Sequence, residues 1–416
     1  IFPHEETIDD NRISGPIIKN SVIVLGVNFE SFDSNLVIKD QIFILDGHHR
    51  YQYIKNNSID DLFEVVLVSM SDIKIESYNS ELLIDDDIFV DENTMFILSS
   101  VSKTVTATAL MQLFENGFFE LDDDIDNYLS FNVNHPDYPL IPITFKMLLT
   151  HSSGIKDNWN VMTYYDGDPE IELSYYLNQY FTPGGEFYNT SLNFTDSMPG
   201  TSYNYTNNGA ALIGLLVEEI SNQLFNDYCN DNIFEPLSMD NAFWFLSEIQ
   251  NLNQIALPYQ ISGGNGDSCF LIGCGIYDQS NPCFCDPACI DYQDCCSDYE
   301  EVCGENGTGS SPGNLTEYEN YGYADYPSGQ LRTTSNNLAK FMSAYMNDGI
   351  YNGVRILESE TIELIKTIQY PMINPKQGLI WKYKNDNGRL LFGHNGGDLG
   401  SSTDMFISFE DSIGVV

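Results

Sequence analysis

Ser100 and Lys103 have the residue types and the spacing of a serine nucleophile with its base. They lie three residues apart in "ILSSVSKTVTATAL" (97–110), so on a helix they occupy one face, one turn apart. A buried amine that has lost its proton can accept the serine proton, which converts a weak hydroxyl into a useful nucleophile. The competing interpretation is that Ser100 only caps the helix.

The Ser-x-x-Lys pattern occurs at two further places, Ser71 with Lys74 and Ser153 with Lys156. Ser71 lies in a strand pattern, where residues three apart point to opposite faces. Ser153 lies in the turn-like "HSSGIK". Only Ser100 opens a predicted helix, where its hydroxyl and its own N–H group face the positive helix end. The context therefore favours Ser100.

Tyr205 and Asn207 are the second candidate pair, in a loop just before a predicted helix. A phenol of pKa about 10 can act as a base when an ammonium group such as that of Lys103 stabilises its anion. Asn207 can position Lys103 and a substrate carbonyl group. The same pattern recurs in less suitable places: Tyr318 and Asn320 in a polar linker, and Tyr345 and Asn347 within a predicted helix.

His394, Gly396 and Gly397 are the third candidate group, in "GHNGG" at the end of a strand-like run. Glycine lets a substrate backbone lie close to a strand edge, and an N–H group near Gly397 can complete an oxyanion hole. His394 can hydrogen-bond developing charge. The rival "KQG" at 376–378 follows Pro375 in a loop and lacks a preceding strand.

The order Ser-x-x-Lys, Tyr-x-Asn, His-x-Gly resembles the penicillin-recognising serine hydrolases, nearest the class C β-lactamase and D-alanyl-D-alanine carboxypeptidase branch. The resemblance includes "ITFKMLLTHSSGI", "PGTSYNYTNNGAALIGLLVEEIS" and "YPSGQLRTTSNNLAKFM", and it covers about 90–416 outside a cysteine-rich stretch. It implies an α/β (α+β) fold over 81–416, in which helices flank an antiparallel sheet beside a helical subdomain. We expect this domain to be cut short at its C-terminus, because the chain stops within an apolar, strand-like run.

The resemblance also implies a role for each candidate. Ser100 would be the acylated nucleophile, Lys103 would assist proton transfer, and Tyr205 would be the general base. Asn207 would bind Lys103 and the substrate amide. The backbone N–H groups of Ser100 and Gly397 would form the oxyanion hole. We expect a small-molecule or peptide substrate, no cofactor and no metal.

The family resemblance bears on two histidines, His394 and His151, in different ways. His394 stands where many members of the family have lysine, which removes a fixed positive charge that would hold a β-lactam carboxylate. We therefore do not expect β-lactam resistance. We interpret His151, in "LLTHSSG", as structural.

Hydrophobic periodicity predicts the elements that must position these residues. We expect a strand over 94–99, a helix over 100–117 that stops at Gly117, helices over 208–230 and 336–350, and two antiparallel strands around a Gly-rich turn within 388–409.

The chain is strongly acidic, with 61 Asp+Glu against 17 Lys+Arg in 416 residues and a net charge of −44. A field of this sign repels nucleic acids and anionic membranes. No stretch reaches the ~18 uncharged apolar residues that a membrane span requires. These features exclude nucleic-acid and membrane-spanning classes, but they do not identify the chemistry.

Eight of the nine cysteines lie between 269 and 303. Such density suits a small domain held by disulfides. Zinc is the competing interpretation, but adjacent cysteines and missing C-x2-C pairs oppose it. The pattern, with "CDPAC" and "DCCSDYEEVCG", resembles a somatomedin B domain. The resemblance implies a disulfide-rich insertion over 266–305 and an extracellular protein partner. Its cysteines are Cys269, Cys274, Cys283, Cys285, Cys289, Cys295, Cys296 and Cys303.

Disulfides require an oxidising compartment, so we expect the protein to be secreted or at the cell surface. N-glycosylation sequences agree with this localisation. We expect Asn204 to carry no glycan, because a glycan there would block a cleft at Tyr205. The ninth cysteine, Cys229, should be a buried free thiol in a helix. The five candidate glycosylation sites are Asn189, Asn193, Asn204, Asn306 and Asn314.

The front segment, 1–80, has an α/β pattern with strands over 21–27 and 41–45, followed by a helix. "LDGHHRYQY" and "FEVVLVS" resemble the ParB/sulfiredoxin-like fold. In the alternative interpretation, residues after 63 supply the first strands of the hydrolase sheet and the front domain is incomplete. A glycine-containing turn beside a cationic side chain is suited to binding a phosphate group. The candidate phosphate-binding residues are Gly47, His48, His49 and Arg50.

Three hypotheses for function remain. The first is a secreted serine hydrolase that acts on an ester, an amide or a D-amino-acid peptide. The second is a catalytically idle hydrolase-fold scaffold that displays the somatomedin B-like module. The third assigns ATP-dependent phosphotransfer to the front segment.

Overall fold

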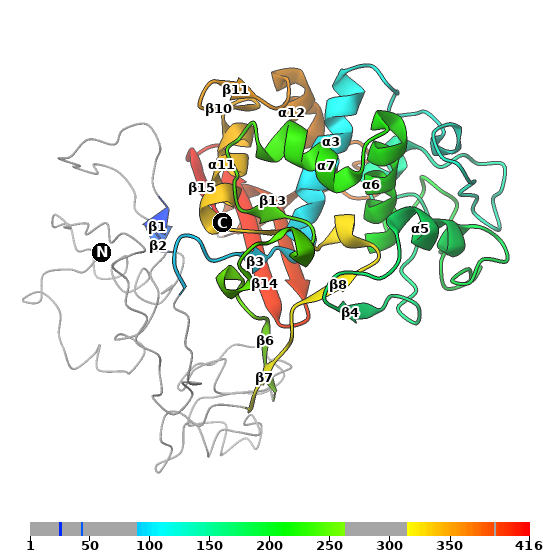
Figure 1. Cartoon of the computed structure of the whole chain (residues 1–416). Coiled ribbons are helices and arrows are strands. Elements are labelled where there is room, and N and C mark those ends of the chain that lie inside the picture. The colour runs from blue at the N-terminus through cyan, green and yellow to red at the C-terminus, as the bar shows by residue number, and fades with distance from the viewer. Residues whose placement is uncertain (1–24, 27–42, 45–89, 263–313, 387) are drawn as a thin grey trace, which may run out of the picture. The chain divides into compact units, whose positions relative to one another are not determined.

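The computed structural model describes residues 25–26, 43–44, 90–262, 314–386 and 388–416 (Figure 1). The chain divides into two compact units, one made of 1–22, 61–64 and 257–319, and the other of 23–60, 65–256 and 320–416. The eight clustered cysteines, the candidate phosphate site at 47–50 and the Ser71/Lys74 pair lie outside the described residues.

The described residues of the first unit form a hairpin, in which β6 (Tyr259–Ser262) pairs antiparallel with β7 (Asn314–Glu317). These two strands flank the segment that contains the cysteine cluster. In the second unit, β1 (Leu25–Gly26) pairs antiparallel with β2 (Phe43–Ile44). Both lie within the strands predicted for the front segment.

The last four strands of the second unit form an antiparallel sheet in the order β12-β13-β14-β15, of which Figure 1 labels β13, β14 and β15. The two strands predicted within 388–409 are confirmed as β13 and β14, with Asp398 opposite Ser401 beside their turn. The strands are β12 (Lys382–Asp386), β13 (Arg389–Asp398), β14 (Ser401–Ser408) and β15 (Ile413–Val415).

β12 pairs with β13 only between Arg389 and Gly393. From His394 to Asp398, β14 is the one partner of β13 among the described strands. This leaves a free strand edge beside the turn that bears Ser100. A Cβ atom added to Gly396 would lie 2.4 Å from the Leu98 carbonyl oxygen and 2.9 Å from the Ser100 nitrogen. Only glycine permits so close an approach.

The helix predicted over 100–117 is confirmed for most of its length as α3 (Ser102–Glu115). It starts two residues later than expected, because the single tight turn η3 (Ser99–Val101) precedes it. Gly117, at a φ of +77°, follows its C-terminus as predicted. α3 is buried on nearly all sides, and two of its threonine hydroxyls bond within the helix region: Thr104 donates to the Val101 carbonyl and Thr108 to the Thr104 carbonyl.

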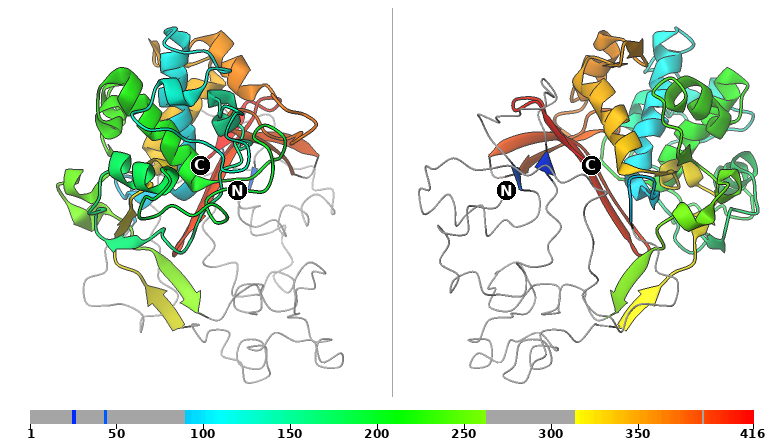
Figure 2. Two further views of the ribbon diagram at one scale, coloured as in Figure 1. Left: turned by 90° about the vertical axis from the view of Figure 1, so that its right-hand side faces the viewer. Right: turned by 60° about the vertical axis from the view of Figure 1, so that its left-hand side comes forward.

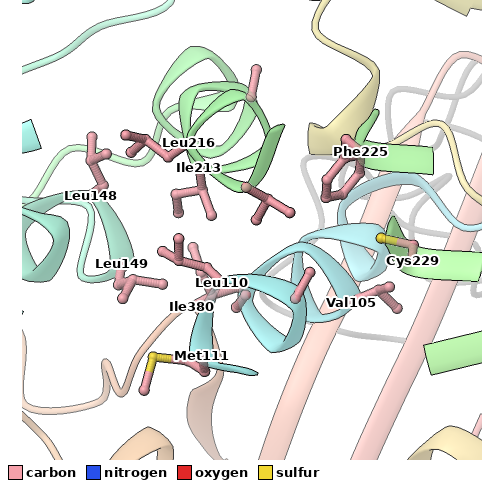
Figure 3. Close-up of a cluster of buried hydrophobic side chains, with 14 of the residues drawn as sticks. Val105, Leu110, Met111, Leu148, Leu149, Ile213, Leu216, Phe225, Cys229 and Ile380 are labelled. Carbon is pink, nitrogen blue, oxygen red and sulfur yellow. The ribbon is translucent and has the colours of Figure 1, made fainter. Parts of the chain in front are cut away.

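The core of the second unit lies between α3, α4 (Phe145–Leu149) and α6 (Asn207–Ser221). Figure 3 shows Leu110 of α3 facing Ile213 of α6, with Leu149 of α4 beside them. Each fully buried side chain of this kind contributes about 1.5–3 kcal/mol of transfer free energy. Cys229 lies in the same cluster as a buried free thiol at the end of a helix, as predicted.

The single helix predicted over 208–230 is wrong. α6 ends at Ser221, and the next residue, Asn222, adopts a left-handed φ of +56°, a conformation that asparagine tolerates better than most residues. A second helix, α7 (Phe225–Cys229), then starts where the Glu218 carboxylate accepts the Phe225 N–H group at 3.0 Å. Both helices bury apolar residues in one core, so the helical spacing continues across the break.

The helix predicted over 336–350 is confirmed as the shorter α11 (Ser335–Met346). Figure 2 shows α3 and α11 on one face of the β13–β14 pair. The predicted strand over 94–99 is reduced to β3 (Phe96–Ile97) in a second sheet of order β3-β9-β5.

The remaining elements are short. They are η4 (Ile125–Asn127), β4 (Tyr164–Asp166), α5 (Leu173–Phe181), η5 (Asn230–Phe234), β5 (Ala242–Phe243), η6 (Leu246–Glu248), η7 (Leu252–Gln254), β8 (Tyr321–Tyr323), η8 (Tyr326–Ser328), β9 (Arg332–Thr333), β10 (Ile350–Tyr351), β11 (Val354–Arg355) and α12 (Ser359–Lys366). In the described part of the chain, no helix has the length and apolar character to cross a membrane.

Candidate active site

Lys103 lies at the centre of the site with its side chain fully buried. Its Nζ donates to Ser100 Oγ at 2.9 Å, to Asn207 Oδ1 at 2.8 Å and to the Ser328 carbonyl oxygen at 2.6 Å. These acceptors use all three donors of an ammonium group. The predicted pairs Ser100/Lys103 and Tyr205/Asn207 are thus joined through the Lys103 amine.

Burial lowers the pKa of Lys103 to about 8, although the nearby carboxylates of Asp157, Asp325 and Asp398 oppose the shift. An amine in that range has a substantial neutral fraction in mildly alkaline solution. The neutral form can accept a proton from the Ser100 hydroxyl, to which it is already hydrogen-bonded.

Ser100 does not cap a helix. Neither η3 nor α3 has a side-chain hydrogen bond at its N-terminus, and the Ser100 hydroxyl accepts from Lys103 instead. The preceding Ser99 adopts a left-handed φ of +47°, which non-glycine residues rarely do and which costs of order 1–3 kcal/mol. The Ser99 hydroxyl is held at 2.6 Å from that of Ser401 on β14. This sharp turn presents the Ser100 side chain toward Lys103.

Tyr205 packs between the two histidines identified in the sequence. Its ring centroid lies 4.5 Å from that of His151 and 6.0 Å from that of His394. Burial raises the pKa of Tyr205, and the neighbouring Ser100 hydroxyl opposes this rise. The contact between the two hydroxyls falls short of hydrogen-bond geometry, so the buried Tyr205 hydroxyl has no hydrogen-bond partner among the described residues.

Both histidines are neutral. Burial, with Lys103 and Lys382 nearby, lowers the pKa of His151 to about 3 and holds that of His394 well below its usual range. His151 Nδ1 accepts the Thr206 N–H group at 3.4 Å, which agrees with a structural role. His394 Nδ1 donates to the Asn395 carbonyl oxygen at 2.6 Å. Because His394 is neutral, it cannot replace the fixed charge of a lysine.

Asp157 positions Asn207, although no motif in the sequence pointed to it. Its carboxylate accepts the Asn207 N–H group at 2.8 Å, the Asn208 N–H group at 3.0 Å and the Thr206 hydroxyl at 2.7 Å. A carboxylate at the N-terminus of α6 satisfies free backbone donors and favours the helix dipole. The signal was present as an acidic residue shortly after "HSSGI", but it lies about 50 residues from the helix that it caps.

Ser328 and Gly329 are also site residues that the sequence analysis missed. Ser328 contributes its carbonyl oxygen to Lys103, and Gly329 lines the cavity above Ser100. Their position depends on a close approach of η8 to α6. A Cβ atom added to Gly214 of α6 would lie 2.6 Å from the Pro327 ring. The only sequence signal was the "YPSGQLR" segment.

A solvent-open cavity contains Ser100, Asn207 and Gly397 in its wall. A Cβ atom added to Gly397 would meet nothing within 4 Å, so this glycine opens into free space. Ser100 and Gly397 can therefore both approach a carbonyl group in the cavity. The cavity is lined by Ser100, Trp159, Met162, Thr163, Tyr164, Asn207, Tyr323, Asp325, Ser328, Gly329, Gly397 and Asp398.

The rival motifs have structural partners. Ser153 is buried, and its hydroxyl accepts from the Ile155 N–H group. The Tyr345 hydroxyl bonds that of Thr108 in the core, and the Gln377 side chain of "KQG" donates to the Ile380 carbonyl. The Asn204 amide nitrogen, to which a glycan would attach, donates to the Ile155 carbonyl at 2.7 Å.

The described residues contain no group of three or more histidine, cysteine or acidic side chains arranged to hold a metal ion. The positions of Ser100, Lys103 and Asn207 suit nucleophilic catalysis by a serine hydroxyl.

A family model described as Beta-lactamase matches residues 84–416. Among curated proteins, Penicillin-binding protein 4* of Bacillus subtilis is 25% identical over 159 residues, which cover 36% of this chain and 30% of that protein. Lovastatin esterase of Penicillium rubens is 27% identical over 200 residues, which cover 41% of this chain and 47% of that protein. The alignments with these curated relatives thus span less than half of their length.

Two solved structures have a similar fold. D-amino acid amidase from Ochrobactrum anthropi SV3, complexed with D-phenylalanine, superposes with a TM-score of 0.54 at 17% identity, over 79% of this chain and 78% of that one. The octameric penicillin-binding protein homologue from Pyrococcus abyssi superposes with a TM-score of 0.51 at 20% identity, over 78% of this chain and 61% of that one.

Proposed function

Because this chain belongs to the Beta-lactamase family, we propose that it is a serine hydrolase that works through an acyl-enzyme on Ser100. One observation carries the proposal. The buried Lys103 amine contacts both Ser100 Oγ and Asn207 Oδ1 at the wall of an open cavity.

The proposed reaction has two displacements. Ser100 Oγ attacks the substrate carbonyl carbon while its proton passes to neutral Lys103, and the oxyanion lies near the N–H groups of Ser100 and Gly397. The bond to the leaving group then breaks, and the leaving group takes up the proton. Water next attacks the acyl carbon, the bond to Ser100 Oγ breaks, and the serine regains a proton.

Lys103 is the better candidate for the base. Its pKa is lowered to about 8, whereas burial raises the pKa of Tyr205. Proton transfer is most efficient when the pKa of the base lies near the working pH. We therefore assign the first proton transfer to Lys103, and we assign to the Tyr205 hydroxyl the relay of that proton, in which it donates its own proton to the leaving group and regains one from the Lys103 ammonium. The resemblance seen in the sequence had implied Tyr205 as the base.

The names of similar proteins support a reaction on esters or amides. Their names include a lovastatin esterase, penicillin-binding proteins and a D-amino acid amidase. We propose an ester, an amide or a D-amino-acid peptide as the substrate. Secretion, a somatomedin B-like insertion and placement in the class C and carboxypeptidase branch are part of the same proposal, supported by the cysteine spacing and the three ordered motifs.

The test uses a fluorophosphonate probe, which acylating serines attack. We expect the probe to label the intact chain at Ser100, as mapped by mass spectrometry, and we expect Ser100→Ala to abolish labelling. Ser153→Ala, at the rival Ser-x-x-Lys serine, is the matched control and should keep the label. Equal labelling of the Ser100→Ala variant and the unmodified chain would refute the proposal. A folded chain that no serine probe labels would favour the idle scaffold.

A further inference from the structure

The cavity in front of Ser100 is acidic. Asp398 and Asp325 line it, and among its described lining residues none is lysine or arginine. Asp398 Oδ1 accepts from the Tyr164 hydroxyl at 2.5 Å and from the Leu399 N–H group at 2.8 Å. None of the ion pairs among the described residues includes Asp398. Within the described part of the chain, Asp398 thus has no cation within ion-pair distance, and only the buried Lys103 and Arg332 attract its charge from farther away.

Aromatic rings surround the same part of the cavity. Trp159 is 65% exposed and Tyr164 is 44% exposed, although both line a cavity. The Tyr164 ring packs edge-on against Tyr321 at 5.1 Å and Tyr323 at 6.0 Å. Exposed aromatic faces beside a carboxylate are a common environment for an organic cation, because ring faces attract positive charge.

Asp398 lies next to the place where the carbonyl group of the substrate would react. Asp398 directly follows Gly397 on β13, so their Cα atoms are about 3.8 Å apart. Tyr205 packs against His394, four residues earlier on the same strand, which is about 13 Å along a strand. In the proposed mechanism the leaving group lies on the Tyr205 side. The Asp398 end therefore faces the acyl side of the substrate.

We propose that this site selects substrates whose acyl group carries a positively charged amine, held by Asp398 and the rings of Trp159 and Tyr164. The inference rests on the proposed function and specifies its substrate class. An acyl group with a carboxylate would meet repulsion from Asp398 in the same place, with no fixed charge from the neutral His394 to balance it.

The test compares three esters of one alcohol, four-nitrophenol, at pH 7. The β-alanyl and butanoyl esters have nearly the same shape and differ in an ammonium against a methyl group, while the succinyl ester carries a carboxylate. We expect kcat/KM to be at least about tenfold higher for the β-alanyl than for the butanoyl ester, the size of one charged hydrogen bond, and lowest for the succinyl ester.

Asp398→Asn removes the charge and keeps an oxygen that can accept from Tyr164 and Leu399. We expect it to lower the ratio of β-alanyl to butanoyl kcat/KM at least about tenfold. Asp404→Asn, which removes an exposed carboxylate on β14 outside the cavity, is the matched control and should leave this ratio unchanged. A butanoyl or succinyl preference, or an unchanged ratio in Asp398→Asn, would overturn the inference.

A second measurement separates this inference from the proposed function. Calorimetry on the Ser100→Ala variant measures binding of β-alaninamide against butanamide without turnover. We expect only β-alaninamide to bind, and its binding should be lost when Asp398→Asn is added. Binding without any ester hydrolysis would refute the hydrolase and keep the cation site, whereas hydrolysis without this binding preference would refute the cation site alone.

Discussion

The Lys103 ammonium has no spare donor, because Ser100, Asn207 and Ser328 together accept all three of its N–H bonds. Loss of one proton breaks one of these bonds. The bond to Ser100 can reverse direction, since a hydroxyl can donate, whereas the Ser328 carbonyl can only accept. The two remaining bonds therefore orient the neutral amine so that it can accept the Ser100 proton.

This arrangement predicts the pH dependence of the reaction. We expect kcat/KM for a neutral ester to rise as the pH passes through about 8, because the neutral, basic fraction of Lys103 increases there. Lys103→Ala should lower kcat by roughly 10²–10⁴, the usual contribution of a general base. The measurement is a pH–rate profile on each variant.

Tyr205→Phe is the comparison for that experiment. It removes the phenol and should lower the rate while the inflection near pH 8 remains. If the inflection instead disappears in Tyr205→Phe and persists in Lys103→Ala, the assignment of the base to Lys103 is wrong.

At the residue scale, the sequence identified every side chain that contacts the Lys103 amine, but not the backbone carbonyl. Motif spacing reports on side chains, so Ser100 and Asn207 could be found. Ser328 acts through its main chain, which leaves no constraint on residue type. Asp157 was missed for another reason: its partners are far away in the chain, and a lone acidic residue in a chain with 61 of them carries little information.

At the scale of elements, β13 fits closely against η3 at Gly396. Gly396→Ala would place a methyl group 2.4 Å from the Leu98 carbonyl oxygen and from Thr403 Oγ1. Backbone atoms cannot move away cheaply, so we expect a loss of about 1–3 kcal/mol in the free energy of unfolding. Activity should fall with it, because the displaced strand carries Gly397. Thermal melting and ester hydrolysis measure the two effects.

Gly397→Ala is the matched variant, since its methyl group would enter open space. It should leave the melting temperature unchanged while it narrows the cavity. Equal melting temperatures for both alanine variants would show that β13 and η3 are not in close contact.

The elements also show where periodicity fails. Apolar spacing predicted most of α3, α11, β13 and β14 because these elements bury most of their apolar side chains. It could not locate the break at Asn222, where α7 continues to pack into the same core. Nor could it foresee the start at η3, because the left-handed φ of Ser99 arises from its packing against Ser401 of β14, three hundred residues later.

At the scale of the whole molecule, the net charge of −44 should make stability depend on salt. Like charges repel across the folded surface, and ions screen this repulsion over a Debye length of about 10 Å at 0.1 M and about 3 Å at 1 M. We expect the melting temperature to rise by a few degrees or more between low and molar sodium chloride. Scanning calorimetry measures it.

Sodium chloride is the suitable salt, because sulfate also stabilises proteins through its exclusion from their surface. The described ion pairs, such as Lys146 with Asp122, involve exposed partners and contribute little. The weakening of these ion pairs by salt should therefore not cancel the gain in melting temperature. A melting temperature that falls with sodium chloride would show that these pairs outweigh the repulsion.

The four groups that meet at Lys103 and the cavity come from η3, the start of α6, the end of η8 and the end of β13. Each precedes the next by some seventy residues or more, so only a fragment that includes all of 100–397 contains the four groups. Non-local contacts of this kind form late during folding, since loop closure must come first. A reactive Ser100 thus reports completed folding, and the fraction of molecules that an active-site label reaches counts the native population directly.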